Sequence, residues 1–201
     1  MIAEQLIDRQ IRLEYAVDRN GLLVPYAGST EQARFILHRH ATGFLAYYRH
    51  DLPSEVREQL AHLLVRNADC EAEAVCRTLA THSPCGAVFT GTSCVFESLP
   101  DPAEFPDAVM TSEGFGVIVG GARVAVAWSV RENESAAELA VETARGFRRR
   151  GFGRQVAAAW ARHIMAMGKA AFYSYERANV ASRGLARSLG VVEFSTVAAY
   201  D

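Results

Sequence analysis

The feature that most constrains the fold is a strand, turn and helix pattern between residues 137 and 167. Residues 137–143 alternate as a strand does, and an arginine- and glycine-rich turn follows, ARGFRRRGFGR. Apolar residues then recur at helical spacing, at Val156, Trp160, Ile164 and Met167. Gly151 and Gly153 therefore fall at a helix N-terminus, where backbone N–H groups lack intrahelical partners and the helix dipole favours an anion. The pattern predicts a turn that holds a pyrophosphate.

A second patterned block follows the end of this helix at Gly168. Residues 169–175 have the composition of a strand, and residues 179–191, NVASRGLARSLGV, predict a short helix that ends at a glycine. Upstream, Phe115–Val119 and Arg123–Val130 predict two strands joined by a hairpin turn at Gly120-Gly121.

Both blocks resemble the hallmarks of the GNAT N-acetyltransferase superfamily. Arg148-x-x-Gly151-x-Gly153 is similar to its pyrophosphate-binding signature, Gln/Arg-x-x-Gly-x-Gly/Ala, and residues 179–191 resemble N-x-x-S-x-x-x-A-x-x-L-G-F/V. The two stand in the family's order, and the resemblance covers roughly residues 110–201. It implies an α/β (α+β) fold, a GNAT-like mixed and mostly antiparallel sheet with flanking helices.

The resemblance also implies a cofactor, acetyl-CoA, which GNAT enzymes bind where the fourth and fifth strands diverge. The Val141 amide would face the thioester carbonyl and the Thr143 amide would hold the pantetheine. The pyrophosphate would lie on the turn, and the cofactor arm would contact Asn179 and Ser182. The turn residues are Arg148, Arg149, Arg150, Gly151, Phe152, Gly153 and Arg154. Two alternatives stay open, because Asn179 is also a preferred helix N-cap and the arginines also suit a solvated loop.

Transfer to an amine needs help with deprotonation, because an alkyl ammonium is only about 0.1% neutral at physiological pH. Glu138 and Glu142 are four residues apart on one predicted strand and so share a face. Glu138 is the first candidate for the catalytic base, by its position in the resemblance, and Glu142 is the second. A solvent-facing strand glutamate is the competing interpretation of each.

The sequence departs from the family pattern at the general acid. Many GNAT enzymes carry a tyrosine seven residues after the asparagine, and this position is Ala186. Tyr173, Tyr175 and Tyr200 lie in the same half, where packing is the simpler role for each. A thiol with a pKa of about 8.5 is a fair leaving group without an acid, so transfer is not excluded.

Composition limits the class of protein. The chain has 201 residues, is 50% hydrophobic and carries a formal net charge of −2. It is long enough for one large domain or two small ones, and it lacks the overall basic charge of a nucleic-acid binder. No apolar run approaches the roughly 20 residues that span a bilayer, and no secretory leader is visible. We expect a cytoplasmic protein with no membrane partner.

Neither the cysteines nor the histidines predict a metal site. The cysteines show no C-x-x-C pair, and the histidines of the first half are scattered without carboxylates at ligand spacing. Buried thiols and surface or half-buried imidazoles are the expected roles. The residues concerned are Cys70, Cys76, Cys85, Cys94, His38, His40, His50 and His62.

The first half lies outside the resemblance. We predict a mainly helical region, residues 1–106, that packs on the catalytic sheet, and an acetyl-CoA-binding domain, residues 107–201. The expected elements are a strand at residues 12–17 before a turn at Asn20-Gly21, three helices, a hairpin and a proline-rich linker. The helices span Ser29 to about Arg49, Pro53 onward with Val56, Leu60, Leu63 and Leu64 on one face, and about Asp69 to Leu79; the hairpin turns at Gly91, and the linker holds Pro100, Pro102 and Pro106.

The leading functional hypothesis is an acetyl-CoA-dependent N-acetyltransferase that acts by direct attack of a small-molecule or peptide amine. One alternative is a CoA-binding sensor or partner module without turnover, which the alanine at position 186 favours. A third hypothesis is a protein that binds nucleic acid through the arginine cluster, which the net charge disfavours. The acceptor stays unidentified, and a homodimer is open because GNAT proteins are commonly dimers.

Overall fold

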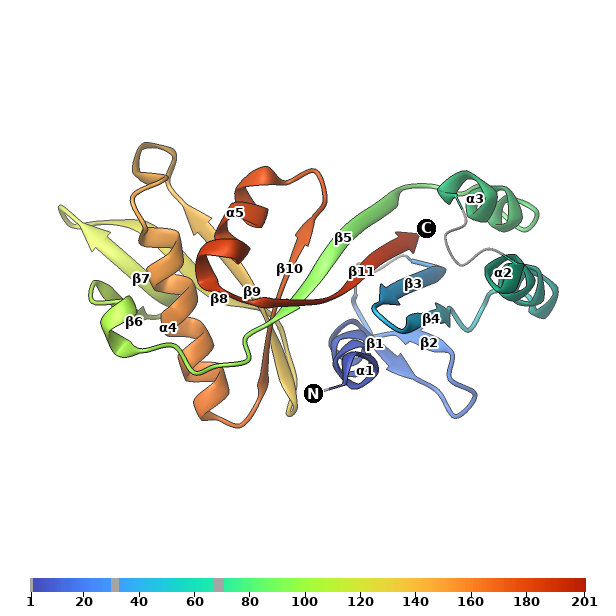
Figure 1. Cartoon of the computed structure of the whole chain (residues 1–201), viewed down its shortest axis with the longest axis horizontal. Helices are drawn as coiled ribbons and strands as arrows, with labels where there is room; N and C mark the ends of the chain where they lie inside the picture. Colours follow the sequence, from blue (N-terminus) through green and yellow to red (C-terminus); the bar gives the residue numbers. More distant parts are fainter. Residues whose placement is uncertain (1, 30–32, 67–70) are drawn as a thin grey trace. The chain divides into compact units, whose positions relative to one another are not determined.

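The computed structural model describes residues 2–29, 33–66 and 71–201, and the chain divides into two compact units (Figure 1). The first unit contains Met1–Gly91 and Ser195–Asp201, and the second contains Thr92–Phe194. The boundary expected between residues 106 and 107 falls inside the second unit. The proline-rich stretch belongs there because Arg162 donates to the Pro100 carbonyl at 2.8 Å and Arg154 pairs with Glu104.

The first unit combines helices and strands. Its helices are α1 (Ala3–Glu14), α2 (Ser54–Arg66) and α3 (Ala72–Ala80), and its strands are β1 (Tyr15–Val17), β2 (Leu23–Pro25), β3 (Phe35–His40), β4 (Gly43–Tyr48) and the end of β11 (Val192–Tyr200). β1 pairs with β2, and β3 lies between β4 and β11, all antiparallel. The turn predicted at Asn20-Gly21 is present, with Gly21 at a φ of 78°.

The core of this unit lies between β3 and the two helices α2 and α3. Phe35 and Leu37 of β3, Leu60 of α2 and Leu79 of α3 are each 0% exposed. Val56, Leu60 and Leu64 line one face of α2, as predicted from their spacing. Each fully buried side chain of this size contributes about 1.5–3 kcal/mol, which explains why these short elements hold together.

The prediction of a helix from Ser29 to about Arg49 is wrong. Residues 35–48 form the β3–β4 hairpin, and the proposed capping box reaches residues 30–32, outside the described residues. The segment alternates as a strand does: Phe35 and Leu37 enter the core, and His38 points to the other face of the sheet, where its ring meets the edge of Tyr47. β-Branched and aromatic residues on both sides of Thr42-Gly43 carry that signal.

Three further element predictions need correction. The first half is mixed rather than mainly helical, because the four strands β1 to β4 lie between α1 and α2. Residues 12–14 close α1, and the strand predicted over 12–17 starts at Tyr15. The hairpin predicted around Gly91 is one continuous strand, β5 (Val88–Val95), because Gly91 keeps the extended conformation of its neighbours.

The second unit is a mixed sheet with two helices on one face. Its strands follow the order β5-β10-β9-β8-β7-β6. The elements are β6 (Ala108–Thr111), β7 (Gly114–Val119), β8 (Ala122–Glu132), β9 (Ala136–Thr143), β10 (Ala170–Glu176), α4 (Phe152–Ala166), α5 (Val180–Leu189) and the 3-10 turns η1 (Pro102–Glu104) and η2 (Arg145–Phe147). β6 to β9 pair antiparallel, and β9 and β10 pair parallel. This is the predicted fold class.

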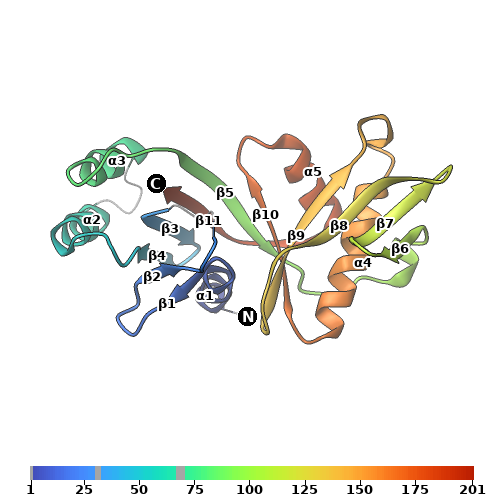
Figure 2. The ribbon, with the colours of Figure 1, turned by 180° about the vertical axis from the view of Figure 1, so that it is seen from behind.

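Helix α4 covers one face of this sheet, as a comparison of Figure 1 with the view from behind in Figure 2 shows. Val156, Trp160 and Ile164, predicted to share one face, are at most 2% exposed, whereas Met167 lies past the helix and is 46% exposed. The predicted Gly120-Gly121 turn is confirmed, with φ of 58° and 80°. In the described part of the chain, no helix is long and apolar enough to cross a membrane.

Candidate cofactor site

The two parallel strands β9 and β10 diverge inside the second unit. Their register runs from Ala136↔Ala170 to Glu138↔Phe172. Beyond this pair, β9 continues to Thr143 and β10 to Glu176, with no register recorded between them among the described residues. The strands therefore open at the position where the sequence resemblance expects the fourth and fifth strands to separate.

The amides of Val141 and Thr143 face this opening. The Ala144 N–H donates to the Val124 carbonyl at 2.8 Å, so even-numbered residues of β9 turn their backbone groups toward β8. The Ala170 N–H donates to the Ser135 carbonyl at 3.0 Å, so odd-numbered residues face the β10 side. Val141 and Thr143 consequently present N–H donors along an edge that β10 has left.

The turn between β9 and α4 has the backbone of an anion-binding loop. Arg149 has a φ of 62°, and among the described residues no other residue except glycines has a positive φ. Gly151 follows with a φ of 83°. Left-handed residues in such a loop turn successive N–H groups inward. Gly151 is the N-cap of α4, and no described side chain caps the helix there. The N–H groups of Phe152, Gly153 and Arg154 are therefore left for a ligand.

Gly153 lets the first turn of α4 approach the end of β9. A Cβ at this position would lie 3.0 Å from the Thr143 hydroxyl and 3.7 Å from Val141. A larger residue would push the helix N-terminus away from the two strand amides. The signature glycine thus has a packing reason that is independent of any ligand.

The turn arginines divide into engaged and outward-facing side chains. Arg148 donates to the Thr143 carbonyl at 3.2 Å, and the Arg150 guanidinium lies over the rings of Phe147 and Phe152, 5.4 and 5.7 Å from their centroids. Arg154 pairs with Glu104 and donates to the Ser188 carbonyl at 2.9 Å, so it joins η1 and α5 to α4. This structural role of Arg154 was not visible in the sequence, because Glu104 lies 50 residues away.

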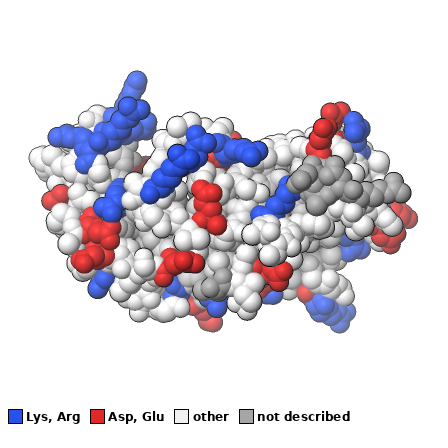
Figure 3. Space-filling view, viewed as in Figure 1, with Lys and Arg blue, Asp and Glu red and all other residues white. Residues whose placement is uncertain are grey.

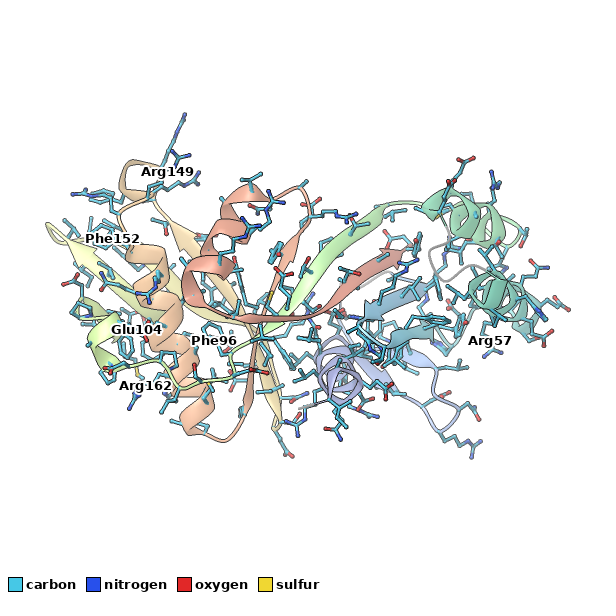
Figure 4. All side chains as sticks on the ribbon, viewed as in Figure 1. Arg57, Phe96, Glu104, Arg149, Phe152 and Arg162 are labelled. Atoms are coloured by element: carbon cyan, nitrogen blue, oxygen red, sulfur yellow. The ribbon has the colours of Figure 1, made fainter. Side chains whose placement is uncertain are left out.

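Arg149 extends away from the protein at this loop (Figure 4). Figure 4 shows its side chain extending from the tip of the turn, above Phe152, and Figure 3 shows basic side chains gathered at that end of the unit. Arg145 and Arg149 have no recorded partner among the described residues. Exposed guanidinium groups beside inward N–H groups suit a multiply charged phosphate ligand.

Asn179 is the N-cap of α5. Its side chain accepts a hydrogen bond from the Ser182 N–H at 3.0 Å, and the helix ends at Gly190, with a φ of 66°. The capping role left open from the sequence is therefore present. The side-chain nitrogen of Asn179 and the hydroxyl of Ser182 are not used in this cap.

Ala186 lies in the core of the second unit. It is 2% exposed and belongs to the same cluster as Tyr173 and Tyr175. Burial raises the pKa of the Tyr173 hydroxyl, which donates to the Ser182 carbonyl at 3.4 Å. Burial and the nearby Glu193 raise the pKa of Tyr175, which donates to that carboxylate at 2.7 Å. A tyrosine at position 186 would have to displace these neighbours.

Substituting Ala186→Tyr should therefore destabilise the protein rather than supply the usual acid. Overpacking a filled core costs about 1–3 kcal/mol. Urea denaturation should show this loss, and the same substitution at Ala181, an exposed position of α5, should change the free energy of unfolding little. Equal effects of A186Y and A181Y would show that the core has room at position 186.

The two glutamates of β9 share the sheet face opposite α4 but differ in surroundings. Glu138 is 5% exposed, and its carboxylate pairs with Arg131 at 2.8 Å. Glu142 is exposed. Sequence reasoning missed Arg131, which the register of β8 and β9 places opposite Glu138.

The described residues hold no group of three or more metal-ligating side chains. His38 is buried, and its Nδ1 lies 3.0 Å from the Ser195 hydroxyl. Cys76 and Cys85 are partly buried, Cys94 is buried, and Cys70 lies outside the described residues.

A family model matches part of this chain. Residues 114–197, somewhat less than half of the chain, match the family model described as FR47-like protein. The match begins at β7 and ends within β11, so it contains both motifs. A search of curated proteins finds no match.

Solved structures share the fold at low identity. A GNAT-family protein from Novosphingobium aromaticivorans has a TM-score of 0.50 and 18% identity, over 58% of this chain and 65% of that one, just under two thirds of its length. An acetyltransferase of the GNAT family from Colwellia psychrerythraea has a TM-score of 0.53 and 14% identity, over 78% and 75% of the two chains. A GCN5-related N-acetyltransferase-like protein from Streptococcus suis has a TM-score of 0.51 and 13% identity, over 88% and 86%.

The family model and the shared fold together support a relationship of the C-terminal half to the GNAT superfamily, as the two motifs predicted. At these identities the structural likeness concerns the fold.

Proposed function

We propose that this protein is an acyltransferase that moves an acetyl group from acetyl-CoA to an amine of a small molecule or peptide. The observation that carries the proposal is the continuity of one donor surface. The N–H groups of Val141 and Thr143 face the opening beside β9, and β9 leads directly into the glycine loop and the uncapped N-terminus of α4. An extended ligand with a carbonyl at one end and phosphates at the other matches that order of donors.

The residues fit the cofactor. The first-turn N–H groups of α4 would take the pyrophosphate, with Arg149 and Arg145 beside it for further phosphate charge. The amide-rich pantetheine arm would lie along β9 like an added strand and accept a hydrogen bond from the Thr143 N–H. The Val141 N–H would donate to the thioester carbonyl. The side-chain nitrogen of Asn179 and the hydroxyl of Ser182 complete the set on the α5 side.

When bound, acetyl-CoA supplies an activated acetyl thioester that an amine can attack without a covalent enzyme intermediate. The Val141 N–H would stabilise negative charge that develops on the carbonyl oxygen. The protein must also hold the amine in its neutral form, and Glu138 and Glu142 are the carboxylates on the sheet face beside the opening. Tyr173 and Tyr175 donate to the Ser182 carbonyl and to Glu193, so departure of the thiolate would proceed without either of these two hydroxyls.

Titration calorimetry of the folded protein with acetyl-CoA tests the proposal. We expect binding in the micromolar range. No binding by correctly folded protein would mean that the loop only starts a helix, and the proposed function would be withdrawn.

The base assignment has its own test. Replacing Glu138 by glutamine should lower turnover at least about tenfold with unchanged acetyl-CoA affinity, because positioned general bases contribute 10²–10⁴-fold. Steady-state kinetics with an accepted amine would measure this effect, and melting curves would show whether loss of the Arg131 pair unfolds the protein. Unchanged turnover in E138Q would remove Glu138 as the base.

The competing candidate is a CoA-binding module without turnover. Burial of Ala186 favours it, because the position of the usual acid is packed into the core. If the protein is such a module, it should bind acetyl-CoA with the same affinity and transfer no acetyl group to any amine.

A further inference from the structure

The sheet face opposite α4 carries an aromatic side chain on β8, the strand on the other side of β9 from the opening. Ala127 packs in the core under α4, and the Ser129 hydroxyl accepts from the Trp160 indole at 3.1 Å, so both face the helix. Trp128, between them, must point to the opposite face. On β9, Leu139 and Val141 pack with α4, so Glu142 lies on the same face as Trp128.

Small neighbours leave the Trp128 ring open at its sides. Ala140 of β9 stands directly opposite Trp128, and on the other side a Cβ added at Gly114 of β7 would come within 3.1 Å of the Trp128 Cβ. Trp128 is only partly buried, whereas Trp160, the other tryptophan, is 2% exposed. Neither adjacent strand therefore covers the ring with a large side chain.

Glu142 is a diagonal neighbour of this ring. It stands opposite Val126, two residues from Trp128 on β8. Diagonal pairs in an antiparallel sheet are about 7–8 Å apart, within reach of an indole and a glutamate. A cation between them would meet a carboxylate and the negative face of an aromatic ring.

The other charges on this part of the sheet already have opposite partners. Arg131 pairs with Glu138 at 2.8 Å, and Arg123 pairs with Glu113 at 2.6 Å. No cationic partner of Glu142 is recorded among the described residues. The face is therefore locally negative at Glu142, next to the amides of Val141 and Thr143.

We propose that Trp128 and Glu142 bind the ammonium group of the acceptor, so that the acceptor class is an alkyl amine that is cationic in solution. This inference rests on the proposed function, because it assigns the acceptor side of the same opening. The ring and the carboxylate select a positive charge, and binding on β9 holds the nitrogen beside the thioester position at Val141.

Nuclear magnetic resonance of the two indole N–H groups tests the inference, with n-butylamine as the cationic probe and n-butanol as the neutral one. Both are titrated into the protein saturated with CoA, which has no acetyl group to transfer, and again without CoA. The Trp128→Phe variant identifies the Trp128 signal. The Trp160 indole, hydrogen-bonded to Ser129 in the core, is the internal reference.

We expect n-butylamine to shift the Trp128 signal saturably and n-butanol to bind at least about tenfold more weakly. Glu142→Gln should weaken n-butylamine at least about fivefold, whereas Glu113→Gln, the same change in the Arg123 pair, should not. The inference would be overturned by equal affinity for the two probes, by the absence of a saturable shift, or by an E142Q variant that binds n-butylamine as tightly as the wild type. Acetyl-CoA binding is measured separately. If acetyl-CoA does not bind, the proposed function is withdrawn, and the titration of the amine without CoA still tests whether Trp128 and Glu142 bind an ammonium group.

Discussion

Replacing Gly151 with glutamate should weaken acetyl-CoA binding at least about 100-fold. Gly151 is the N-cap of α4, and nothing lies within 4 Å of a Cβ built there, so the new carboxylate can extend over the N–H groups meant for the pyrophosphate. It would cap those donors and repel the phosphates, and each tenfold loss in affinity corresponds to about 1.4 kcal/mol. Calorimetric titration of wild type and variant measures the ratio of dissociation constants.

The matched control is Gly151→Ala. Both variants place a side chain at a φ of 83°, which costs about 1–2 kcal/mol of backbone strain, but only glutamate adds charge. We expect the alanine variant to retain acetyl-CoA binding within a few-fold of wild type. Equal losses in G151E and G151A would show that backbone conformation, not an anion site, explains the effect.

Lowering the pH from 7.5 to 5 should destabilise the protein through His38 by about 2 kcal/mol. Burial, and secondarily the charge of His40, lowers the pKa of His38 from 6.5 to about 4. Between these values the unfolded chain binds a proton that the folded chain excludes, so stability is complete above pH 6.5 and falls as the pH drops toward 4. The full difference is about 3 kcal/mol, at about 1.4 kcal/mol per pKa unit.

Urea denaturation at both pH values, with wild type and His38→Gln, isolates this contribution. Glutamine can keep a hydrogen bond with Ser195 and does not titrate, so the pH dependence should shrink by about 2 kcal/mol in H38Q. His62→Gln, at an exposed position on α2, should leave the pH dependence as in wild type. An identical pH dependence of H38Q and wild type would contradict the burial argument.

The motif-bearing half could be predicted from sequence because its signals are local. Gly151 starts α4, Asn179 caps α5, and Gly120-Gly121 closes a two-residue hairpin, each through a property of the residue itself. The helical spacing of Val156 and Trp160 likewise identified the face that becomes buried.

The first half was harder because its strands find partners far along the chain. β3 pairs with β11, more than 150 residues later, and β5 lies beside β10. Without such partners in view, the spacing of Ser29 and Gln32 favoured a helix to about Arg49, although residues 35–48 form the β3–β4 hairpin. Gly91 likewise favoured a turn, although it is extended within β5. The environments of Glu138 and Arg154 depend on Arg131 and Glu104, which only the folded chain brings near.

The sequence could specify the cofactor side of the predicted site better than the acceptor side. The backbone donors of Val141, Thr143 and the α4 N-terminus follow from a strand, a turn and a helix in sequence order. The acceptor side follows from which face each strand residue takes, and the β-bulge between Ser129 and Arg131 shifts that register in a way no local pattern indicates.

Acetyl transfer itself is tested by mass-spectrometric detection of acetylated product from the wild-type protein, acetyl-CoA and a panel of alkyl amines. We expect an acetylated amine together with an equal amount of free CoA, and no product from the matching alcohols. Acetyl-CoA binding without any acetylated amine across the panel would contradict this expectation and identify the protein as a CoA-binding module.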